Sequence, residues 1–163
     1  MTIKARLFGL TILWCAIIGG LIGFKQHTVS TGRQVVFRAM SRGVLGNTLG
    51  VGPHVSLRYD INSIEMKSGT VSKYHVRDKV YVGLVISKGY AIVSGIHDTL
   101  PQSGFFIVGI VRAVGDDMLD VKYGIEHYYL NAGENASQYP YGSVLDVQVA
   151  IDSFGDSSIL SLK

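Results

Sequence analysis

Apolar and polar side chains alternate along several short segments of this chain, and this period of two constrains the fold more than any other feature. The clearest cases are residues 55–61, 119–123 and 145–151. Their apolar positions are Val55, Leu57, Tyr59 and Ile61, then Leu119, Val121 and Tyr123, then Leu145, Val147, Val149 and Ile151. Successive side chains of a strand point to opposite faces of a sheet, so each segment is typical of a half-buried strand. No stretch after residue 25 has helical periodicity, and we expect an all-β fold, an antiparallel sandwich or a partly open barrel.

Three pairs of predicted strands are spaced as hairpins. Residues 80–86 and 90–96 flank a short connection in which Gly89 can adopt the left-handed conformation of a tight turn. Residues 105–114 are joined by residues 115–117 to a strand that starts at Met118. Residues 144–151 and 158–162 bracket a polar loop. All three pairs predict antiparallel neighbours.

One of these segments, residues 105–114, is almost continuously apolar. Such a run predicts a central strand that is covered on both faces. Any helix in this part of the chain should be short, and we expect it within residues 63–73 or 131–141.

The N-terminal part of the chain has a different character. Residues 7–24 carry no charge and one hydroxyl group, that of Thr11. At about 1.5 Å of rise per residue, this run is roughly 27 Å long as a helix, close to the bilayer core of about 30 Å. We therefore expect residues 1–25 to form a transmembrane anchor that contacts lipid through residues 7–24, and residues 26–163 to form one β-rich domain.

A cleavable signal peptide is the competing interpretation of this run, because a basic start followed by an apolar core also marks export signals. Residues 23–27 contain no small-x-small cleavage site, and bulky residues precede Cys15, which argues against a lipoprotein signal. Gly19 and Gly23 form a GxxxG pair that would permit close helix pairing. Basic residues flank the run on both sides, so charge does not decide the orientation. Large domains translocate largely regardless of charge, and we expect the domain outside the cytoplasm.

The charges of residues 26–163 balance. The whole chain carries a net charge of +3, which comes from Lys4, Arg6 and Lys25. A neutral domain is a poor nucleic-acid binder, so we expect no nucleic-acid partner. The basic residues cluster early, since Arg33, Arg38, Arg42 and Arg58 precede the first acidic residue, Asp60. This pattern fits a basic first strand that pairs with acidic later strands, or a basic segment that touches anionic lipid headgroups.

Metal and cofactor chemistry has little support in the sequence. The histidines are scattered without ligand spacing, at positions 27, 54, 75, 97 and 127, and Cys15 is the one cysteine. We therefore expect neither a metal nor a cofactor.

One enzymatic alternative is a membrane-tethered peptidase of the Ser/Lys type. Ser30 or Ser41 would be its nucleophile, and a buried lysine with a lowered pKa would be its base. The candidate lysines are Lys67, Lys73 and Lys79. No nucleophile motif surrounds either serine.

Two segments resemble the GDYXXLXY family of small membrane-anchored bacterial proteins. Residues 52–59 align with the family's Gly-Asp-Tyr-x-x-Leu-x-Tyr motif. They match it at Gly52, Leu57 and Tyr59 and differ from it at Pro53 and His54. Residues 123–129, with Gly133 downstream, resemble its Tyr-Gly-Ile-Glu-x-Tyr-Phe block. The resemblance implies a single-pass protein of the bacterial cytoplasmic (inner) membrane with its domain on the periplasmic side, often encoded beside polytopic membrane proteins. It implies no reaction.

The second of these segments allows two interpretations from its residues. In the structural one, Gly124 permits a bend and Glu126 fixes it by accepting hydrogen bonds from backbone groups or from an arginine such as Arg58 or Arg112. In the functional one, the tyrosines supply rigid contact area for a peptide or membrane partner. The residues singled out for this structural or partner-binding motif are Gly52, Leu57, Tyr59, Tyr123, Gly124, Glu126 and Tyr128.

We therefore expect a binding or assembly module for another membrane protein, without catalysis. Exposed sheet edges make strand addition a natural means of association. A third hypothesis, a ligand sensor, would require a sizeable concave apolar pocket.

Overall fold

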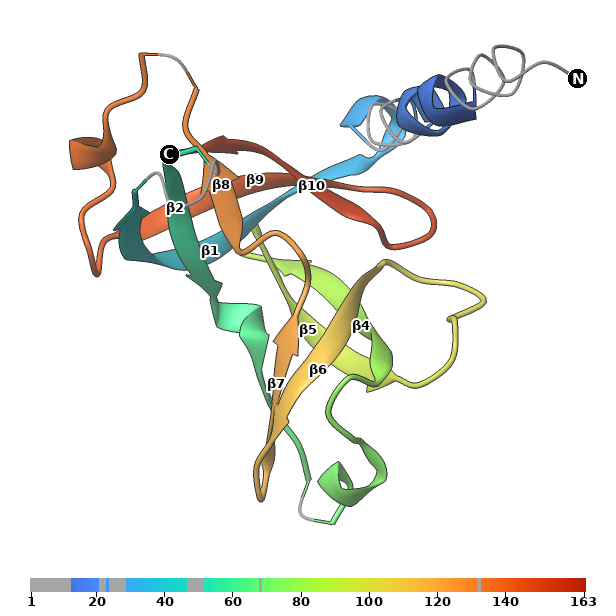
Figure 1. Cartoon of the computed structure of the whole chain (residues 1–163). Helices are drawn as coiled ribbons and strands as arrows, with labels where there is room; N and C mark the ends of the chain where they lie inside the picture. Colours follow the sequence, from blue (N-terminus) through green and yellow to red (C-terminus); the bar gives the residue numbers. More distant parts are fainter. Residues whose placement is uncertain (1–12, 21–22, 24–28, 47–51, 68, 132) are drawn as a thin grey trace, which may run out of the picture.

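The computed structural model of the chain describes residues 13–20, 23, 29–46, 52–67, 69–131 and 133–163. Among these residues, ten strands form two five-stranded antiparallel sheets, and each sheet curls into a nearly closed barrel (Figure 1). The strands are β1 (Arg33–Leu45), β2 (His54–Tyr59), β3 (Ser63–Glu65), β4 (Lys79–Ser87), β5 (Tyr90–His97), β6 (Phe106–Val114), β7 (Met118–Lys122), β8 (His127–Tyr129), β9 (Val144–Ile151) and β10 (Ser157–Leu162). The all-β prediction is confirmed, but the chain forms two partly open barrels rather than one.

The first barrel has the strand order β10-β9-β1-β2-β8. Its central strand, β1, pairs with β9 along its first part and with β2 along its second part. A bulge between Ser41 and Val44 interrupts the pairing with β2, and Gly43 has a φ of 91° there. This conformation suits glycine, and a bulge bends a strand so that it can curl around a core.

The second barrel has the strand order β3-β7-β6-β4-β5. The predicted hairpin is present as β4 and β5, joined by Lys88 and Gly89, whose φ angles of 50° and 87° are both positive. Two positive φ angles are typical of the two-residue turns that match the twist of antiparallel strands.

Strand β6 is central, as predicted, but only its first half is covered on both faces. The loop between β9 and β10 covers that half, where the Val108 N–H donates to the Gly155 carbonyl at 2.9 Å. Towards the end of β6, Ile110 and Val114 are exposed. The prediction of two covered faces is wrong for this second half, because the loop of the first barrel does not extend that far.

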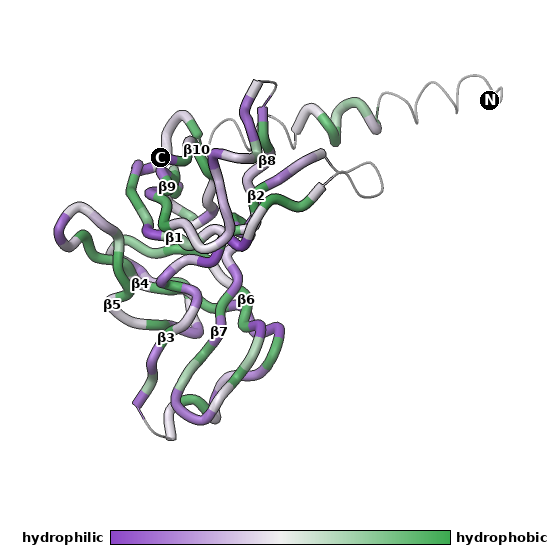
Figure 2. The backbone as a smooth tube through the Cα atoms, turned by 90° about the vertical axis from the view of Figure 1, so that its left-hand side faces the viewer, coloured by the Kyte–Doolittle hydropathy of each residue, from purple (hydrophilic) through white to green (hydrophobic). Residues whose placement is uncertain are grey.

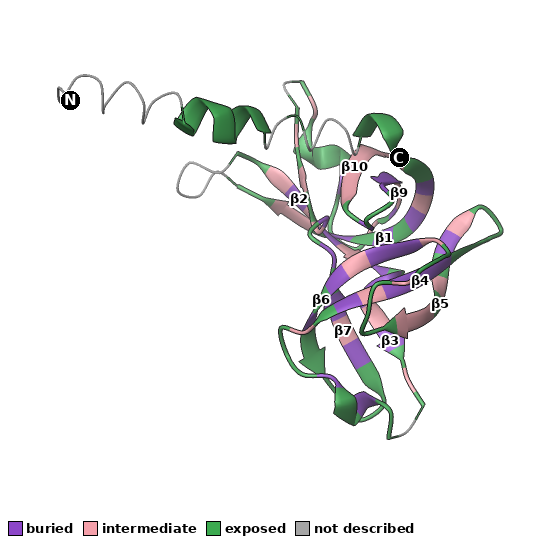
Figure 3. Cartoon of the chain, turned by 90° about the vertical axis from the view of Figure 1, so that its right-hand side faces the viewer, coloured by how far each residue is buried: buried purple, intermediate pink, exposed green. Residues whose placement is uncertain are grey.

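The buried residues form one continuous hydrophobic cluster that includes side chains of both barrels. The apolar positions of the three alternating segments are all buried, as the period of two predicts. Hydrophobic and hydrophilic residues alternate along the strands (Figure 2), and the buried positions recur along them (Figure 3). The inward faces of both barrels therefore belong to one core.

Among the described residues of the domain, residues 29–31 are helical, and the remaining helical structure consists of short 3₁₀ turns. They are η1 (Asp60–Asn62), η2 (Val71–Lys73) and η3 (Ala136–Gln138), and the last two lie within the segments where short helices were expected. Residues 13–20 are helical, but most of the rest of the expected span, residues 7–24, lies outside the described residues. Within the part that is described, no helix combines the length and the apolar character needed to cross a bilayer.

Candidate functional site

The chain passes between the two barrels twice, and the two passages lie side by side. One runs from β2 through η1 to β3, and the other runs from β7 through residues 123–126 to β8. The Tyr59 hydroxyl donates to the Ile125 carbonyl at 2.8 Å, and the Tyr123 hydroxyl donates to the Ile61 carbonyl at 2.6 Å. These reciprocal bonds join the passages, and we call residues 59–62 and 123–126 the junction.

Both tyrosines of the junction are buried. Burial, with a smaller effect of the nearby Glu126 carboxylate, raises the pKa of each hydroxyl well above its ordinary value of 10.0. Both hydroxyls therefore stay protonated and act as donors at neutral pH. The ring of Phe37 packs edge-on against Tyr59 at 5.9 Å between centroids, which ties the junction to the core of the first barrel.

Glu126 holds the bend between β7 and β8. Its two carboxylate oxygens accept hydrogen bonds from the Tyr123 and Gly124 N–H groups, at 2.6 and 2.9 Å. Gly124 has a φ of 82°, a conformation that favours glycine. The Glu126 carbonyl in turn accepts from the Leu57 N–H at 2.8 Å. The donors to this carboxylate are thus backbone groups, one of the two possibilities in the structural interpretation, whereas Arg58 and Arg112 bind another carboxylate.

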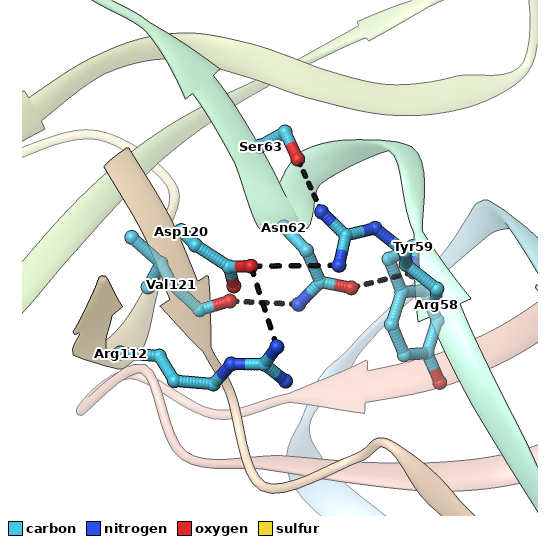
Figure 4. A network of polar contacts seen from close by, with 7 residues as sticks. All are labelled: Arg58, Tyr59, Asn62, Ser63, Arg112, Asp120 and Val121. Atoms are coloured by element: carbon cyan, nitrogen blue, oxygen red, sulfur yellow. Dashed lines mark hydrogen bonds and ion pairs between the residues drawn. The ribbon is translucent and has the colours of Figure 1, made fainter. Parts of the chain in front are cut away.

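Asn62 connects η1 to the second barrel in the same region (Figure 4). Its Oδ1 accepts from the Tyr59 N–H at 2.6 Å, and its Nδ2 donates to the Val121 carbonyl at 2.7 Å. The side chain is buried, so these bonds satisfy polar groups that water cannot reach. Sequence reasoning missed Asn62, because a single Asn after a strand most often signals a turn.

The carboxylate that the two arginines share belongs to Asp120. Its Oδ2 lies 3.4 Å from Arg58 Nη1 and 3.7 Å from Arg112 Nη2. Arg58 Nη2 also donates to Ser63 Oγ at 2.7 Å. Figure 4 shows Asp120 between the two guanidinium groups, which come from β2 and β6. Asp120 occupies a polar position of an alternating strand, so the sequence pattern did not distinguish it from a solvated residue.

The structure brings together five of the seven residues singled out from the sequence. Leu57, Tyr59, Tyr123, Gly124 and Glu126 meet at the junction or bond directly to it.

The other two residues, Gly52 and Tyr128, lie outside the junction. Gly52 is exposed before β2. Tyr128 orders the loop after β8 by donating to Glu134 at 2.9 Å. Partial burial, helped by the hydrogen bond to Glu134, raises the pKa of Tyr128 to about 12.

A second feature of interest is the opening of the second barrel between β3 and β5, the end strands of its sheet. A cleft of about 620 Å³ lies there, and we call it the seam. Its lining includes apolar side chains, among them Ile61, Ile64 and Ala91. Two cations, Arg38 and Lys88, and two carboxylates, Asp60 and Glu65, also border it.

The unpaired backbone groups of β5 face the seam. Ser87 and Tyr90 flank a two-residue turn, so they exchange the first hydrogen bonds of the hairpin. Hydrogen-bonded and non-bonded pairs alternate along antiparallel strands, which directs the backbone N–H and C=O groups of Ala91 and Val93 away from β4. The Leu84 N–H agrees with this register, because it donates to Phe105 and not to its β5 partner, Val93.

The same alternation applies to β3. The Met66 N–H donates to the Asp117 carbonyl at 2.9 Å, just beyond the paired residues of β3 and β7. Hydrogen-bonded and non-bonded pairs alternate back along β3 from this bond, so the backbone groups of Ser63 and Glu65 point away from β7 and towards the seam. The seam therefore has backbone donors and acceptors on both sides.

The residues of the peptidase alternative do not assemble. Ser41 is fully buried, and its Oγ donates to the Tyr139 carbonyl at 3.2 Å. Lys67, Lys73 and Lys79 are exposed, so they lack the burial that a catalytic lysine requires. Ser30 is exposed as well.

The histidines show no ligand cluster in the described part of the chain. His54 and His127 pack edge-on, 5.0 Å between ring centroids. Among the described residues, no group of three His, Cys, Asp or Glu side chains could hold a metal ion.

Comparison of the chain with protein-family models, with curated proteins and with solved structures gives no match. The resemblance of residues 52–59 and 123–133 to the GDYXXLXY family thus stays an expectation, and function has to be inferred from the geometry.

Proposed function

We propose that this chain is a membrane-anchored module that binds an extended segment of a partner membrane protein, by strand addition at the seam and without catalysis. The open seam is the observation that carries this proposal. Ala91 and Val93 on one side, and Ser63 and Glu65 on the other, offer backbone groups that an added strand can bind. Edge strands are natural templates for this mode of recognition.

The side chains of the seam indicate what kind of segment would fit. Ile61, Ile64 and Ala91 are buried side chains of its lining, so they favour apolar residues on the inward face of the bound strand. The charges at its border balance, two against two, and select for neither an acidic nor a basic segment. A partner strand with alternating apolar residues matches this surface.

The location of the module is part of the same proposal. Residues 7–24 would fix it in the bacterial cytoplasmic membrane, with residues 26–163 on the periplasmic side. The described helical residues support contact with lipid, because Leu13, Trp14, Ile17 and Ile18 are exposed apolar side chains. A membrane position would place the seam near segments of other membrane proteins.

The proposal is tested by the substitution Val93→Pro. Proline lacks the N–H group that Val93 directs into the seam, and edge strands tolerate proline where that group does not bind a neighbouring strand. We expect the variant to fold and to lose its partner. The measurement is co-purification of the full-length chain in mild detergent, followed by mass spectrometry.

Ile159→Pro is the matched control. The Asp152 N–H donates to the Asp156 carbonyl, just before the paired residues of β9 and β10. Hydrogen-bonded and non-bonded pairs alternate from this bond onward, so the Ile159 N–H points away from β9, towards the open edge of the first barrel. This control should keep the partner that the unmodified protein retains. Recovery of the same partner with Val93→Pro, or recovery of the unmodified protein alone, would refute strand addition at the seam.

A further inference from the structure

A second cleft, of about 180 Å³, lies beside the junction. We call it the junction cleft. Four cationic side chains from four different strands line it, namely Arg42, Arg58, Arg112 and Lys122. These residues are far apart in the sequence, and only the packing of the two barrels brings their charges together.

The carboxylates of the junction cleft do not balance these cations. It contains Asp120 and Glu126. Asp120 lies between Arg58 and Arg112, and Glu126 accepts from two backbone N–H groups. Within the described residues, neither Arg42 nor Lys122 forms an ion pair. Four cations against two carboxylates leave two positive charges in excess.

The neighbouring His127 responds to this environment. Partial burial, His54 and Lys122 lower the pKa of His127 from its ordinary value of 6.5, and Glu126 opposes them. The imidazole is thus mostly neutral at pH 7. An anion bound beside it would favour the charged form and raise this pKa.

From this geometry we propose that the junction cleft binds a phosphate group. A phosphate monoester carries a charge of about −1.5 to −2 at pH 7, which matches the excess better than one carboxylate does. The size of the cleft is also suitable, because sites for larger organic ligands are typically about 300–1,000 Å³. Arginine supplies several N–H donors in a planar fork, and Lys122 adds a mobile ammonium group.

Two sources could supply this group, a soluble phosphate or the phosphate of a lipid headgroup. The chemistry of recognition is the same in both cases. Arg42 and Lys122 do not line the seam, so the two proposals can fail separately.

The test uses the full-length chain in an uncharged maltoside detergent. Titration with inorganic phosphate, followed by calorimetry, should show saturable binding. The double variant Arg42→Gln/Lys122→Gln should bind at least about tenfold more weakly, because each substitution removes a positive charge and its charge-assisted hydrogen bonds to the anion. Neither residue forms an ion pair among the described residues, so the fold should survive.

A matched double variant, Arg33→Gln/Lys79→Gln, removes the same two charges away from the cleft and should bind phosphate as the unmodified protein does. A second arm measures flotation with vesicles of phosphatidylcholine alone and of phosphatidylcholine with phosphatidic acid. Loss of phosphate binding confined to the cleft variant supports the proposal with a soluble source. Loss of binding to the phosphatidic acid vesicles, confined to the same variant, supports it with a lipid source.

A measurement on the unmodified protein guards against a variant that does not fold. Phosphate, or short-chain phosphatidic acid added to the micelles, should raise the pKa of His127 in an NMR titration of its imidazole signals. The proposal is overturned if neither probe binds, if the cleft variant binds as tightly as the matched control, or if the pKa of His127 does not change with either probe.

Discussion

At the scale of single residues, polar side chains of the junction bind backbone groups near the ends of strands or just beyond them. Glu126 accepts from Tyr123 and Gly124, and Asn62 bridges Tyr59 and Val121. A buried polar group that loses its partner costs free energy, so each of these side chains stabilises an irregular segment. This is why the chain can bend between β7 and β8, where Tyr123 and Gly124 belong to no strand.

Replacing Glu126 by alanine should therefore destabilise the protein. We expect the free energy of unfolding to fall by about 1–3 kcal/mol, since two hydrogen bonds to a charged acceptor are lost and the bend relaxes. Urea unfolding of the full-length chain measures this change. Glu65→Ala, at an exposed position of β3, should change it by less than about 0.5 kcal/mol. Equal effects of the two substitutions would argue against the structural role of Glu126.

At the scale of elements, loops and turns decide which strand faces are covered. The loop between β9 and β10 belongs to the first barrel, yet it lies on β6 of the second barrel. It can do so because Gly155 has no side chain. A Cβ atom at this position would lie 2.7 Å from a ring carbon of Phe106 and 2.9 Å from Val108.

The substitution Gly155→Ala tests this contact. An alanine at this position has to adopt a φ of 81°, and its Cβ atom clashes with Phe106 and Val108. We expect the clash to lower the free energy of unfolding by about 1–3 kcal/mol beyond the cost of the backbone conformation. Gly142→Ala isolates the backbone effect, because Gly142 has a φ of 82° and open space around it. Thermal unfolding of both variants gives the difference. If they are equally stable, close packing of this loop contributes nothing.

At the scale of the whole molecule, the two barrels pack against each other. They share one hydrophobic cluster, and the junction ties both chain passages together. Both open features, the seam and the junction cleft, lie where the curvature of the sheets leaves side chains or strand edges unpaired. The two proposed binding surfaces thus arise from how the barrels close and meet.

The hydroxyls of Tyr59 and Tyr123 predict how the stability of the whole molecule depends on pH. Their pKa values are raised in the folded state, so the folded protein holds protons that the unfolded chain releases above about pH 10. Their contribution is fully present below that pH and is lost as the pH rises further. The double variant Tyr59→Phe/Tyr123→Phe should be less stable at neutral pH, by about 1 kcal/mol for each hydroxyl, and should lose less stability in alkali.

Urea unfolding from neutral pH to about pH 11 measures both effects. Tyr141→Phe is the control, since its side chain is 82% exposed and should follow the unmodified protein. If the double variant loses as much stability in alkali as the unmodified protein does, folding does not raise the pKa values of these two tyrosines.

The amino-acid sequence by itself determined seven of the ten described strands, their inward side chains and the tight turn at Gly89; it gave no bounds for β1 or β8, and β3 lies in a segment where a short helix was expected. These features depend on local patterns, because alternation along a strand directly reflects which face is buried. It also drew attention to both halves of the junction, through Leu57 and Tyr59 and through residues 123–126. It contained no local signal that the two halves meet, since Tyr59 and Ile125 lie 66 positions apart.

Only the tertiary structure decided that the strands form two barrels instead of one, and that both barrels stay partly open. The cationic side chains of the junction cleft have no common spacing along the chain, and Asp120 has the pattern of an ordinary solvated strand residue. Periodicity reports burial within a segment, whereas sheet closure and charge clustering depend on long-range packing between segments. Most of the strands could therefore be predicted locally, and the surfaces proposed to bind a peptide strand and a phosphate group could not.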